Sequence, residues 1–229
     1  MFICKYSIFS QYSTHNTLVS IQFAILKNKM KENLFSVPFY EFYSSDKEFN
    51  SVITPLIYSH LEKIEHTLSS IDKNKFDCSK NGLTSFYGPN LSNIPEFDSV
   101  KNFLLSSLTQ EYQELIQIQN FWFTVYKEDH FIPRHTHPNS QWSGVYYVKA
   151  EKNCGDINFF DPSADYKNHC GDISGTSYRV TPQSGMFVTF PSWLAHQSEP
   201  NKSSTDRIII SFNFYTDVYD AFPPLSVYL

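Results

Sequence analysis

Residues 134–148 read "RHTHPNSQWSGVYYV" and join a His-x-His pair to an apolar, aromatic run. In an extended segment the side chains alternate between two faces, so His135 and His137 point the same way. Imidazole is a ligand for iron, zinc, copper and nickel. A Pro-Asn-Ser turn separates the pair from "SGVYYV", a run typical of a β-strand. The stretch predicts two candidate metal ligands beside a strand, although such a pair alone is equally typical of two polar loop residues.

The rest of the chain after Asn120 continues in short strand-like runs. These are "FWFTVY", "SGVYYVKA", "DINFF", "SYRVT", "GMFVTF" and "RIIISFNFY", each bounded by turn residues. This spacing is typical of an all-β sandwich or barrel. The runs leave no room for crossover helices, so we expect residues 121–216 to form two facing antiparallel sheets.

The segment before Asn120 has a different pattern of apolar residues. Apolar residues at helical spacing predict helices over residues 46–72 and 96–118, outside the sheets. Residues 34–43 favour an edge strand, because Pro38 removes a hydrogen-bond donor. His60 and His66 fall on the first of these helices and are expected on its surface.

Composition excludes several classes of protein. The chain has 229 residues, 41% of them hydrophobic, enough for one globular domain with a sizeable core or for a domain with an arm. A net charge of -5 without a Lys/Arg run does not favour binding to nucleic acid. No apolar run of about 18 residues occurs, so no membrane span is expected. The four cysteines are widely spaced, which indicates free thiols in the reducing cytoplasm.

The N-terminal residues stand apart from the rest. Met30 opens "MKENLFSVPFYEF", which reads like the start of a domain, and residues 30–229 are expected to form it. Residues 1–29 are then an extension, either disordered or an artefact of an upstream start site. An ordinary strand over residues 18–26 is the alternative.

A second set of candidate residues lies in the C-terminal part of the β-region. Residues 182–200, "PQSGMFVTFPSWLAHQSEP", run through a turn, a strand and a loop to His196. Arg207 follows eleven residues later and opens an apolar strand. Burying an arginine is costly without an anion, and a planar guanidinium holds a carboxylate through two hydrogen bonds. Arg207 is therefore a candidate carboxylate-binding residue, unless it pairs with an acid at the surface.

Three sequence blocks in this order, "HTHPNSQWSGVYYV", "GDINFFDP" and "FPSWLAH", carry a resemblance. From about Met30 to Tyr215 the chain resembles the iron(II)/2-oxoglutarate-dependent oxygenases, specifically a branch found in marine bacteria and phages. The resemblance implies a mainly β fold, the double-stranded β-helix or jelly roll, with two or more flanking helices from the N-terminal half. It also implies Fe(II) as cofactor and 2-oxoglutarate as cosubstrate.

The resemblance implies a metal-ligand set by position. His135 and His196 would be the two histidine ligands, and His137 stands where the family usually has Asp or Glu. A neutral imidazole there makes the metal site more positive by one charge. Asn139 and Asp161 are alternative oxygen donors, which we rank below His137.

The resemblance also implies residues for the cosubstrate and the substrate pocket. Arg207 would bind the distal carboxylate of 2-oxoglutarate, and Tyr147 would help to hold it. Tyr147 is otherwise a core aromatic, since it and Tyr146 point to opposite faces. Trp142 and Trp193 flank the ligand segments and either wall the pocket or only cover its mouth.

The implied activity is oxidation, in most cases hydroxylation, of an unknown small molecule or protein side chain. One alternative is a cupin-like three-histidine metal enzyme without a keto acid, although "PNSQW" lacks the Glu that cupins usually carry after His-x-His. Another alternative is a non-enzymatic jelly-roll binding module. The sequence determines neither the substrate nor the oligomeric state.

Overall fold

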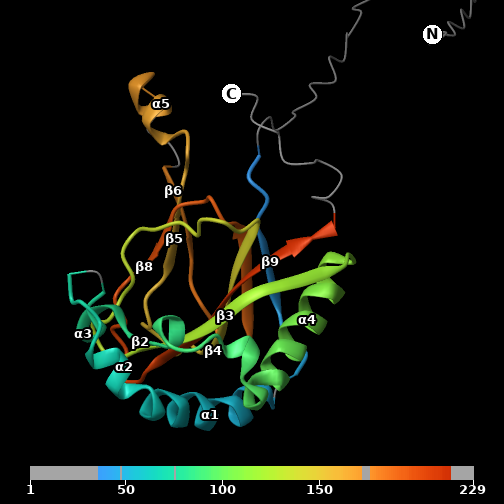
Figure 1. Cartoon of the computed structure of the whole chain (residues 1–229). Coiled ribbons are helices and arrows are strands. Elements are labelled where there is room, and N and C mark those ends of the chain that lie inside the picture. Colours follow the sequence, from blue (N-terminus) through green and yellow to red (C-terminus); the bar gives the residue numbers. More distant parts are fainter. Residues whose placement is uncertain (1–35, 47, 75, 172–175, 218–229) are drawn as a thin grey trace, which may run out of the picture. The chain divides into compact units, whose positions relative to one another are not determined.

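The computed structural model of the chain describes residues 36–46, 48–74, 76–171 and 176–217 (Figure 1). Contacts divide the chain into Met1–Ser36 and Val37–Leu229, and the description below concerns the second unit. The expectations for residues 1–29, for a boundary at Met30 and for a strand over residues 18–26 lie outside the described residues. Within the described part, no helix has the length and apolar character needed to cross a membrane.

Two antiparallel sheets form the framework of this unit. The larger sheet has six strands in the order β1-β7-β4-β9-β3-β2, and the smaller has three in the order β6-β5-β8. The strands are β1 (Tyr40–Tyr43), β2 (Leu83–Thr84), β3 (Ile116–Tyr126), β4 (Trp142–Lys149), β5 (Ile157–Phe160), β6 (Ser177–Val180), β7 (Met186–Pro191), β8 (His196–Ser198) and β9 (Arg207–Thr216). Every pairing between them is antiparallel. The prediction of a mainly β, double-sheet fold is confirmed, with sheets that do not close into a barrel.

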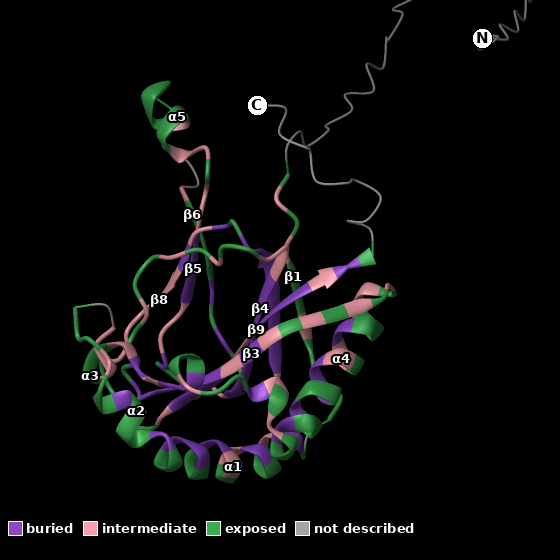
Figure 2. Cartoon of the chain, in the orientation of Figure 1, coloured by how far each residue is buried: buried purple, intermediate pink, exposed green. Residues whose placement is uncertain are grey.

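Alternation along the long strands gives the large sheet two different faces. On β9, Ile208 and Ile210 are buried in the cluster of residues that packs against the helices, whereas Ile209 is buried in a second cluster. The second cluster joins the large sheet to the small one, because it contains Tyr147 and Ile209 together with Phe159 of β5. Figure 2 shows these strands as the most buried part of the domain. Successive strand residues therefore pack alternately against the helices and into the space between the two sheets.

The α-helices are α1 (Phe49–Lys63), α2 (Glu65–Ser69), α3 (Cys78–Asn81), α4 (Asp98–Tyr112) and α5 (Ala164–His169), and 3-10 turns occur at Ser85–Tyr87, Leu91–Asn93 and Pro95–Phe97. Helices α1 and α4 cover the outer face of the large sheet, whereas α5 lies apart, beyond the ends of β5 and β6 (Figure 1). Apolar residues of α1 and α4 pack against one another and against the sheet; for example, Phe49 stacks on Phe103 with ring centroids 3.7 Å apart. The prediction that two helical regions lie outside the sheets is confirmed.

The extents of the two helical regions differ from the prediction. The first region is two helices, because α1 ends before Ile64 and α2 begins at Glu65. The second region ends at Tyr112, since Gln113 adopts a left-handed conformation with φ 54° that stops the helix. Leu115, which falls within the predicted helix over residues 96–118, instead precedes β3 and is exposed. The predicted edge strand is confirmed as β1, which begins later, at Tyr40.

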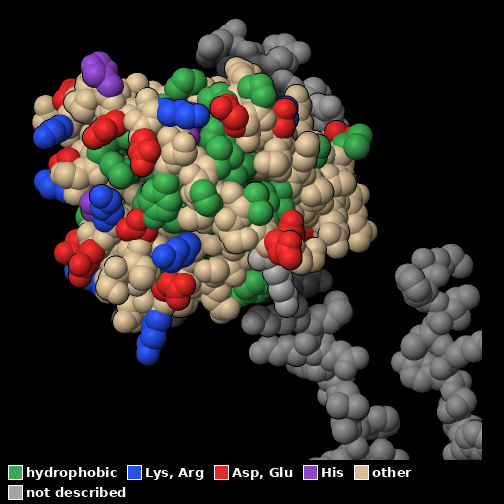
Figure 3. Space-filling model, turned by 90° about the horizontal axis from the view of Figure 1, so that it is seen from below, with side chains coloured by type: hydrophobic (Ala, Val, Ile, Leu, Met, Phe, Trp, Pro, Cys, Tyr) green, Lys and Arg blue, Asp and Glu red, His purple; other side chains and the backbone are tan. Residues whose placement is uncertain are grey.

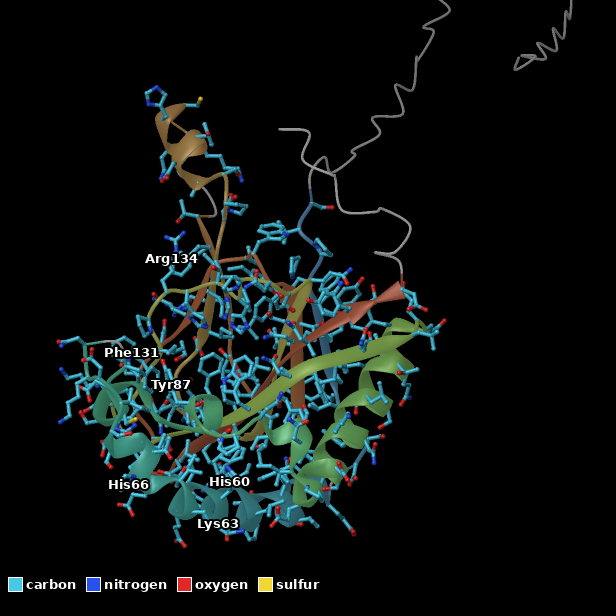
Figure 4. All side chains as sticks on the ribbon, in the orientation of Figure 1. His60, Lys63, His66, Tyr87, Phe131 and Arg134 are labelled. Atoms are coloured by element: carbon cyan, nitrogen blue, oxygen red, sulfur yellow. The ribbon has the colours of Figure 1, made fainter. Side chains whose placement is uncertain are left out.

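The outer face of the helical layer has a mixed surface. Figure 3 views the unit from the α1 side and shows acidic and basic side chains interspersed there rather than gathered by sign. His66 is exposed, as predicted. The prediction for His60 is wrong: it is only 7% exposed, and its ring packs against Phe97 and Phe123 beneath the sheet (Figure 4). Among the described residues its Nε2 has no hydrogen-bond partner.

The buried position of His60 predicts a pH dependence of stability. Burial lowers its pKa below the ordinary 6.5, nearby Lys63 acts in the same direction, and Glu96 opposes both. Because the unfolded chain then binds the proton more readily, the free energy of unfolding decreases as pH falls from about 6.5 towards the pKa of the folded state. We expect the free energy of unfolding of His60→Leu to fall less than that of the wild type between about pH 7.5 and 5.5, as measured by urea unfolding. The exposed control His66→Leu should retain the wild-type pH dependence, and the same dependence in both variants would contradict the assignment.

Candidate metal centre and adjoining cavity

The three predicted histidines meet between the two sheets. His135 forms an isolated antiparallel bridge with His196, through two backbone hydrogen bonds of 2.9 and 3.0 Å. The backbone N–H of His137 donates to the Ser192 carbonyl, which ties the same loop to the end of β7. One ring nitrogen from each histidine lies within 4.8 Å of the others. Two segments about sixty residues apart thus present three imidazoles to one point.

Hydrogen bonds set the orientation of all three rings. The Nδ1 of His135 lies 2.9 Å from the Pro133 carbonyl, and the Nδ1 of His196 lies 2.9 Å from the Leu194 carbonyl. The Nδ1 of His137 lies 2.8 Å from Oδ1 of Asn213. These oxygens only accept, so each Nδ1 carries the proton and each Nε2 keeps its lone pair. Ligating histidines are held by the same kind of bond.

The geometry of the nitrogens fits a shared first-row metal ion. The Nε2 atoms of His135 and His137 are 3.2 Å apart. Two nitrogens that each lie roughly 2.0–2.1 Å from one ion are expected about 3.0–3.4 Å apart. Facing lone pairs at this distance repel each other unless a proton or a cation lies between them. Burial lowers the pKa of all three histidines, that of His137 to about 4, so the rings are neutral donors near pH 7.

The alternative oxygen ligands do not reach this point. Asp161 accepts hydrogen bonds from Ser163 and Lys167, and these bonds lower its pKa to about 2. Neither Asp161 nor Asn139 is among the residues that line the cavity beside the histidines. Among the described residues, the group of metal-ligand type at this point consists of the three histidines alone.

Arg207 lies at the inner end of the same cavity. Its side chain is 2% exposed, with the guanidinium carbon 4.3 Å from the centre of the Tyr126 ring. Nη1 donates to the carbonyls of Cys154, Gly155 and Glu199, and Nη2 donates to Oγ of Ser198. Among the described residues it has no carboxylate partner. The alternative, a pairing of Arg207 with a surface acid, is therefore not found among the described residues, and the buried charge suits an anionic ligand.

Tyr147 faces this end of the cavity as well. It is 3% exposed, and its hydroxyl has no hydrogen-bond partner among the described residues. Burial raises its pKa, while the charge of Arg207 acts in the opposite direction. Tyr146 points to the other face and donates to Asn50 of α1. Ser198, which accepts from Arg207, follows His196 by two residues on β8, so the cationic end of the cavity adjoins the histidine cluster.

The cavity itself has a volume of about 380 Å³. It contains the histidine cluster, Arg207 and Tyr147 in one continuous space. Residues 120–213 of the sequence match the protein family described as "Putative 2OG-Fe(II) oxygenase". The matched region runs from β3 into β9 and so includes the three histidines and Arg207.

Solved structures share the fold of this domain. AviO1 from Streptomyces viridochromogenes Tue57 matches with a TM-score of 0.54 at 15% identity, over 82% of this chain and 92% of that one. HygX from Streptomyces hygroscopicus, solved with nickel and 2-oxoglutarate, matches with a TM-score of 0.50 at 12% identity, over 79% and 83% of the two chains. An oxidoreductase of the 2OG-Fe(II) oxygenase family from Burkholderia pseudomallei has a TM-score of 0.43 at 13% identity. That match covers 53% of this chain and 59% of the Burkholderia chain. A comparison with curated protein sequences gave no match.

Aromatic residues that the sequence did not indicate also line the cavity. The cavity is lined by Phe76, Phe86, Tyr87 and Trp122. The two tryptophans proposed from sequence, Trp142 and Trp193, do not line it; Trp142 packs against Tyr112 and Phe214, and Trp193 is 55% exposed. Trp122 could have been found from the alternation of β3, since it shares a face with Tyr126. The other three come from a turn-rich segment whose sequence shows no periodicity.

Asn213 is a second residue that sequence reasoning missed. Its Oδ1 accepts from His137 and from Oγ of Ser143, and its Nδ2 donates to Oδ1 of Asn120. It lies on the same face of β9 as Arg207, six residues along. A buried asparagine inside an apolar strand, at an even spacing from the arginine, was a signal available in the sequence.

The contact of Asn213 with His137 predicts a role in metal affinity. We expect Asn213→Ala to weaken the binding of a first-row divalent ion roughly 10–100-fold, because the His137 ring loses the acceptor that orients it. Asn120→Ala, one hydrogen bond further from the ring, is the matched control and should have a smaller effect. Calorimetric titration of Ni²⁺ into the metal-free protein measures both. Equal losses in the two variants would indicate a general loosening of the fold instead.

Proposed function

We propose that the protein is a non-haem iron(II) oxygenase that oxidises an organic substrate with dioxygen and 2-oxoglutarate. The balanced reaction converts 2-oxoglutarate, O2 and R–H into succinate, CO2 and R–OH. The observation that carries the proposal is one cavity with three convergent neutral imidazoles and, beside them, a buried arginine without a carboxylate partner among the described residues. The family match over residues 120–213 supports it.

In this proposal His135, His137 and His196 hold the iron ion. When bound, iron(II) would supply the redox chemistry by which dioxygen and 2-oxoglutarate react. The three neutral donors leave the other coordination positions for ligands from solution. The hydrogen bonds to Pro133, Leu194 and Asn213 keep the rings in the tautomer that presents Nε2.

Arg207 and Tyr147 hold the distal carboxylate of 2-oxoglutarate in this proposal. Nε and the second N–H of Nη2 remain after the internal hydrogen bonds of Arg207, and they suit a planar carboxylate. The Tyr147 hydroxyl adds an unused donor at the same end of the cavity. HygX has been solved with nickel and 2-oxoglutarate, and by analogy we extend both a metal ion and that keto acid to this chain.

The cellular setting and the substrate are the remaining parts of the proposal. The three cysteines that the structure describes are free thiols, which suits the cytoplasm, where disulfides are rare. The substrate is a small molecule or a protein side chain, and the mixed surface charges do not favour nucleic acid.

Two measurements test the proposed function. Oxygen-free titration of 2-oxoglutarate should detect binding to the Ni²⁺-loaded protein and much weaker binding to the metal-free protein. Aerobic incubation of the Fe(II)-loaded protein with 2-oxoglutarate and a panel of candidate substrates should release succinate, and a chelator should stop the release. Absence of metal-dependent 2-oxoglutarate binding would reject the proposal in favour of a cupin-like enzyme or a binding module.

A further inference from the structure

The cavity contains a continuous series of aromatic rings that leads away from the histidine cluster. The Trp122 ring lies 5.6 Å from the His137 ring, and Phe86 lies 5.1 Å from Trp122, measured between ring centroids. Tyr87 follows at 5.2 Å from Phe86, and Phe76 at 5.1 Å from Tyr87. All of these residues line the same cavity. We refer to Trp122, Phe86, Tyr87 and Phe76 as the aromatic track.

The outer part of the track reaches the surface. Phe86 is 53% exposed and Tyr87 is 40% exposed. Tyr87 lies on the side of the unit that carries α3 (Figure 4). Single exposed aromatics are common, but adjoining ones that continue into a cavity are typical of a ligand groove. The core of the protein does not require these rings, because Phe86 and Tyr87 are absent from both buried clusters.

The backbone that carries the track is held firmly in place. The Phe86 N–H donates to Oγ1 of Thr84, and Oγ of Ser85 accepts from the Phe123 N–H on β3. Thr84 also pairs with β3 through β2. Phe86 is thereby fixed beside Trp122, which suits a preformed binding wall.

The polar groups of the cavity exclude a charged ligand along this wall. No Lys, Asp or Glu lines the cavity among the described residues, and the one charged side chain is Arg207 at the inner end. The remaining polar lining consists of amides and hydroxyls, among them Gln119, Asn120 and Ser211. A charge on the ligand would lose its hydration there without gaining a partner.

We propose that the substrate of this oxygenase carries an uncharged planar ring, which stacks on the aromatic track and so brings its reacting carbon towards the histidine cluster. The proposal rests on the proposed function and adds the chemical class of the substrate. Aromatic walls favour flat apolar rings through offset-stacked and edge-to-face contacts. A cavity of about 380 Å³ that also admits 2-oxoglutarate leaves space for one small ring system rather than a long chain.

Three probes built on one fused bicyclic ring system test the chemical class. 2-Naphthol is planar and neutral, 2-naphthoate is planar and charged, and decahydro-2-naphthol is neutral but not planar. Calorimetric titration into the Ni²⁺-loaded protein with saturating 2-oxoglutarate should give the tightest binding for 2-naphthol. The other two should bind at least about fivefold more weakly. Decahydro-2-naphthol loses the aromatic contacts, and 2-naphthoate must lose the hydration of its charge. Equal or tighter binding of 2-naphthoate would overturn the proposal.

Variants of the track locate the binding. Phe86→Ala should weaken 2-naphthol binding about five- to tenfold, and Phe86→Leu should have an intermediate effect because it keeps apolar volume without a ring. Tyr166→Ala is the matched control, since Tyr166 is 80% exposed on α5 and does not line the cavity. Unchanged 2-oxoglutarate affinity in the Phe86 variants verifies that they fold. Wild-type affinity for 2-naphthol in Phe86→Ala would overturn the proposal.

The same titration without 2-oxoglutarate separates this proposal from the proposed function. Ring binding that depends on Phe86 in a protein that does not bind 2-oxoglutarate would support the aromatic track and reject the oxygenase assignment. Metal-dependent 2-oxoglutarate binding without any preference for 2-naphthol would retain the oxygenase assignment and reject the planar ring.

Discussion

Arg207→Ala is expected to weaken the binding of 2-oxoglutarate at least about thirtyfold. Removing one partner of a buried charge pair typically costs about 2–5 kcal/mol, and about 1.4 kcal/mol is a factor of ten in affinity. Arg207 is 2% exposed, and its charge has no carboxylate partner among the described residues, so the keto acid would neutralise it. Oxygen-free calorimetric titration of the Ni²⁺-loaded protein measures the loss.

Arg207 also has a structural role, and the controls must separate the two. Its Nη1 satisfies three backbone carbonyls, so Arg207→Ala is expected to lower the melting temperature as well. Arg207→Lys retains the charge but not the paired donors, and its affinity for the keto acid should be intermediate. Arg179→Ala removes an exposed arginine that does not line the cavity and should bind 2-oxoglutarate like the wild type. Metal affinity should be nearly unchanged in all three.

The outcome for Arg207 discriminates between the candidate functions. Equal 2-oxoglutarate affinity in the wild type and in Arg207→Ala would make Arg207 a purely structural residue. Tyr147→Phe provides an independent measure, because it removes only the hydroxyl. A lost hydrogen bond to a charged group costs about 1.5–3 kcal/mol, so we expect roughly a tenfold or greater loss of affinity.

The second large effect is expected for His137. Loss of a hydrogen bond that supports a metal ligand costs roughly 10–100-fold in metal affinity. His137→Ala removes a direct ligand, so it should decrease the affinity for a divalent first-row ion by more than that. The 3.2 Å separation of its Nε2 from that of His135 is the observation behind this expectation. Calorimetric titration with Ni²⁺ measures it, and the exposed His66→Ala serves as the control.

His137→Asp tests why the chain has a histidine at this position. A carboxylate is an ordinary third ligand beside two histidines and lowers the charge of the site by one, so binding of the ion should be retained. Oδ1 of Asn213 would then face another oxygen, and its amide must rotate to donate Nδ2 instead. If His137→Ala bound metal like the wild type, the third ligand would have to be another group, and the three-histidine assignment would be wrong.

Periodicity within single strands accounts for the parts of the fold that were predictable. The alternation of "RIIISFNFY" separates Arg207 and Ile209 from Ile208 and Ile210, and the two sets lie on opposite faces of β9. Side-chain direction in a strand depends only on residue parity, which is a local property. The extents of the helices were less predictable, since the left-handed residue Gln113 that ends α4 is neither Gly nor Asn.

Local sequence by itself determined which residue types were available for chemistry: a same-face histidine pair, a distal histidine and an arginine that opens an apolar strand. Only the tertiary structure decided that Pro133, Leu194 and Asn213 orient the three rings, and that Asp161 is held by Lys167 away from them. It also decided that Phe86, from a segment without periodicity, lies beside Trp122. The contacts of His137 with Asn213 and of Phe86 with Trp122 join segments tens of residues apart. The contacts at Pro133, Leu194 and Lys167 are between near neighbours in sequence, in loops and a short helix whose conformation local periodicity does not predict. Their geometry depends on the register between strands and on turn conformations, which no single stretch of sequence contains.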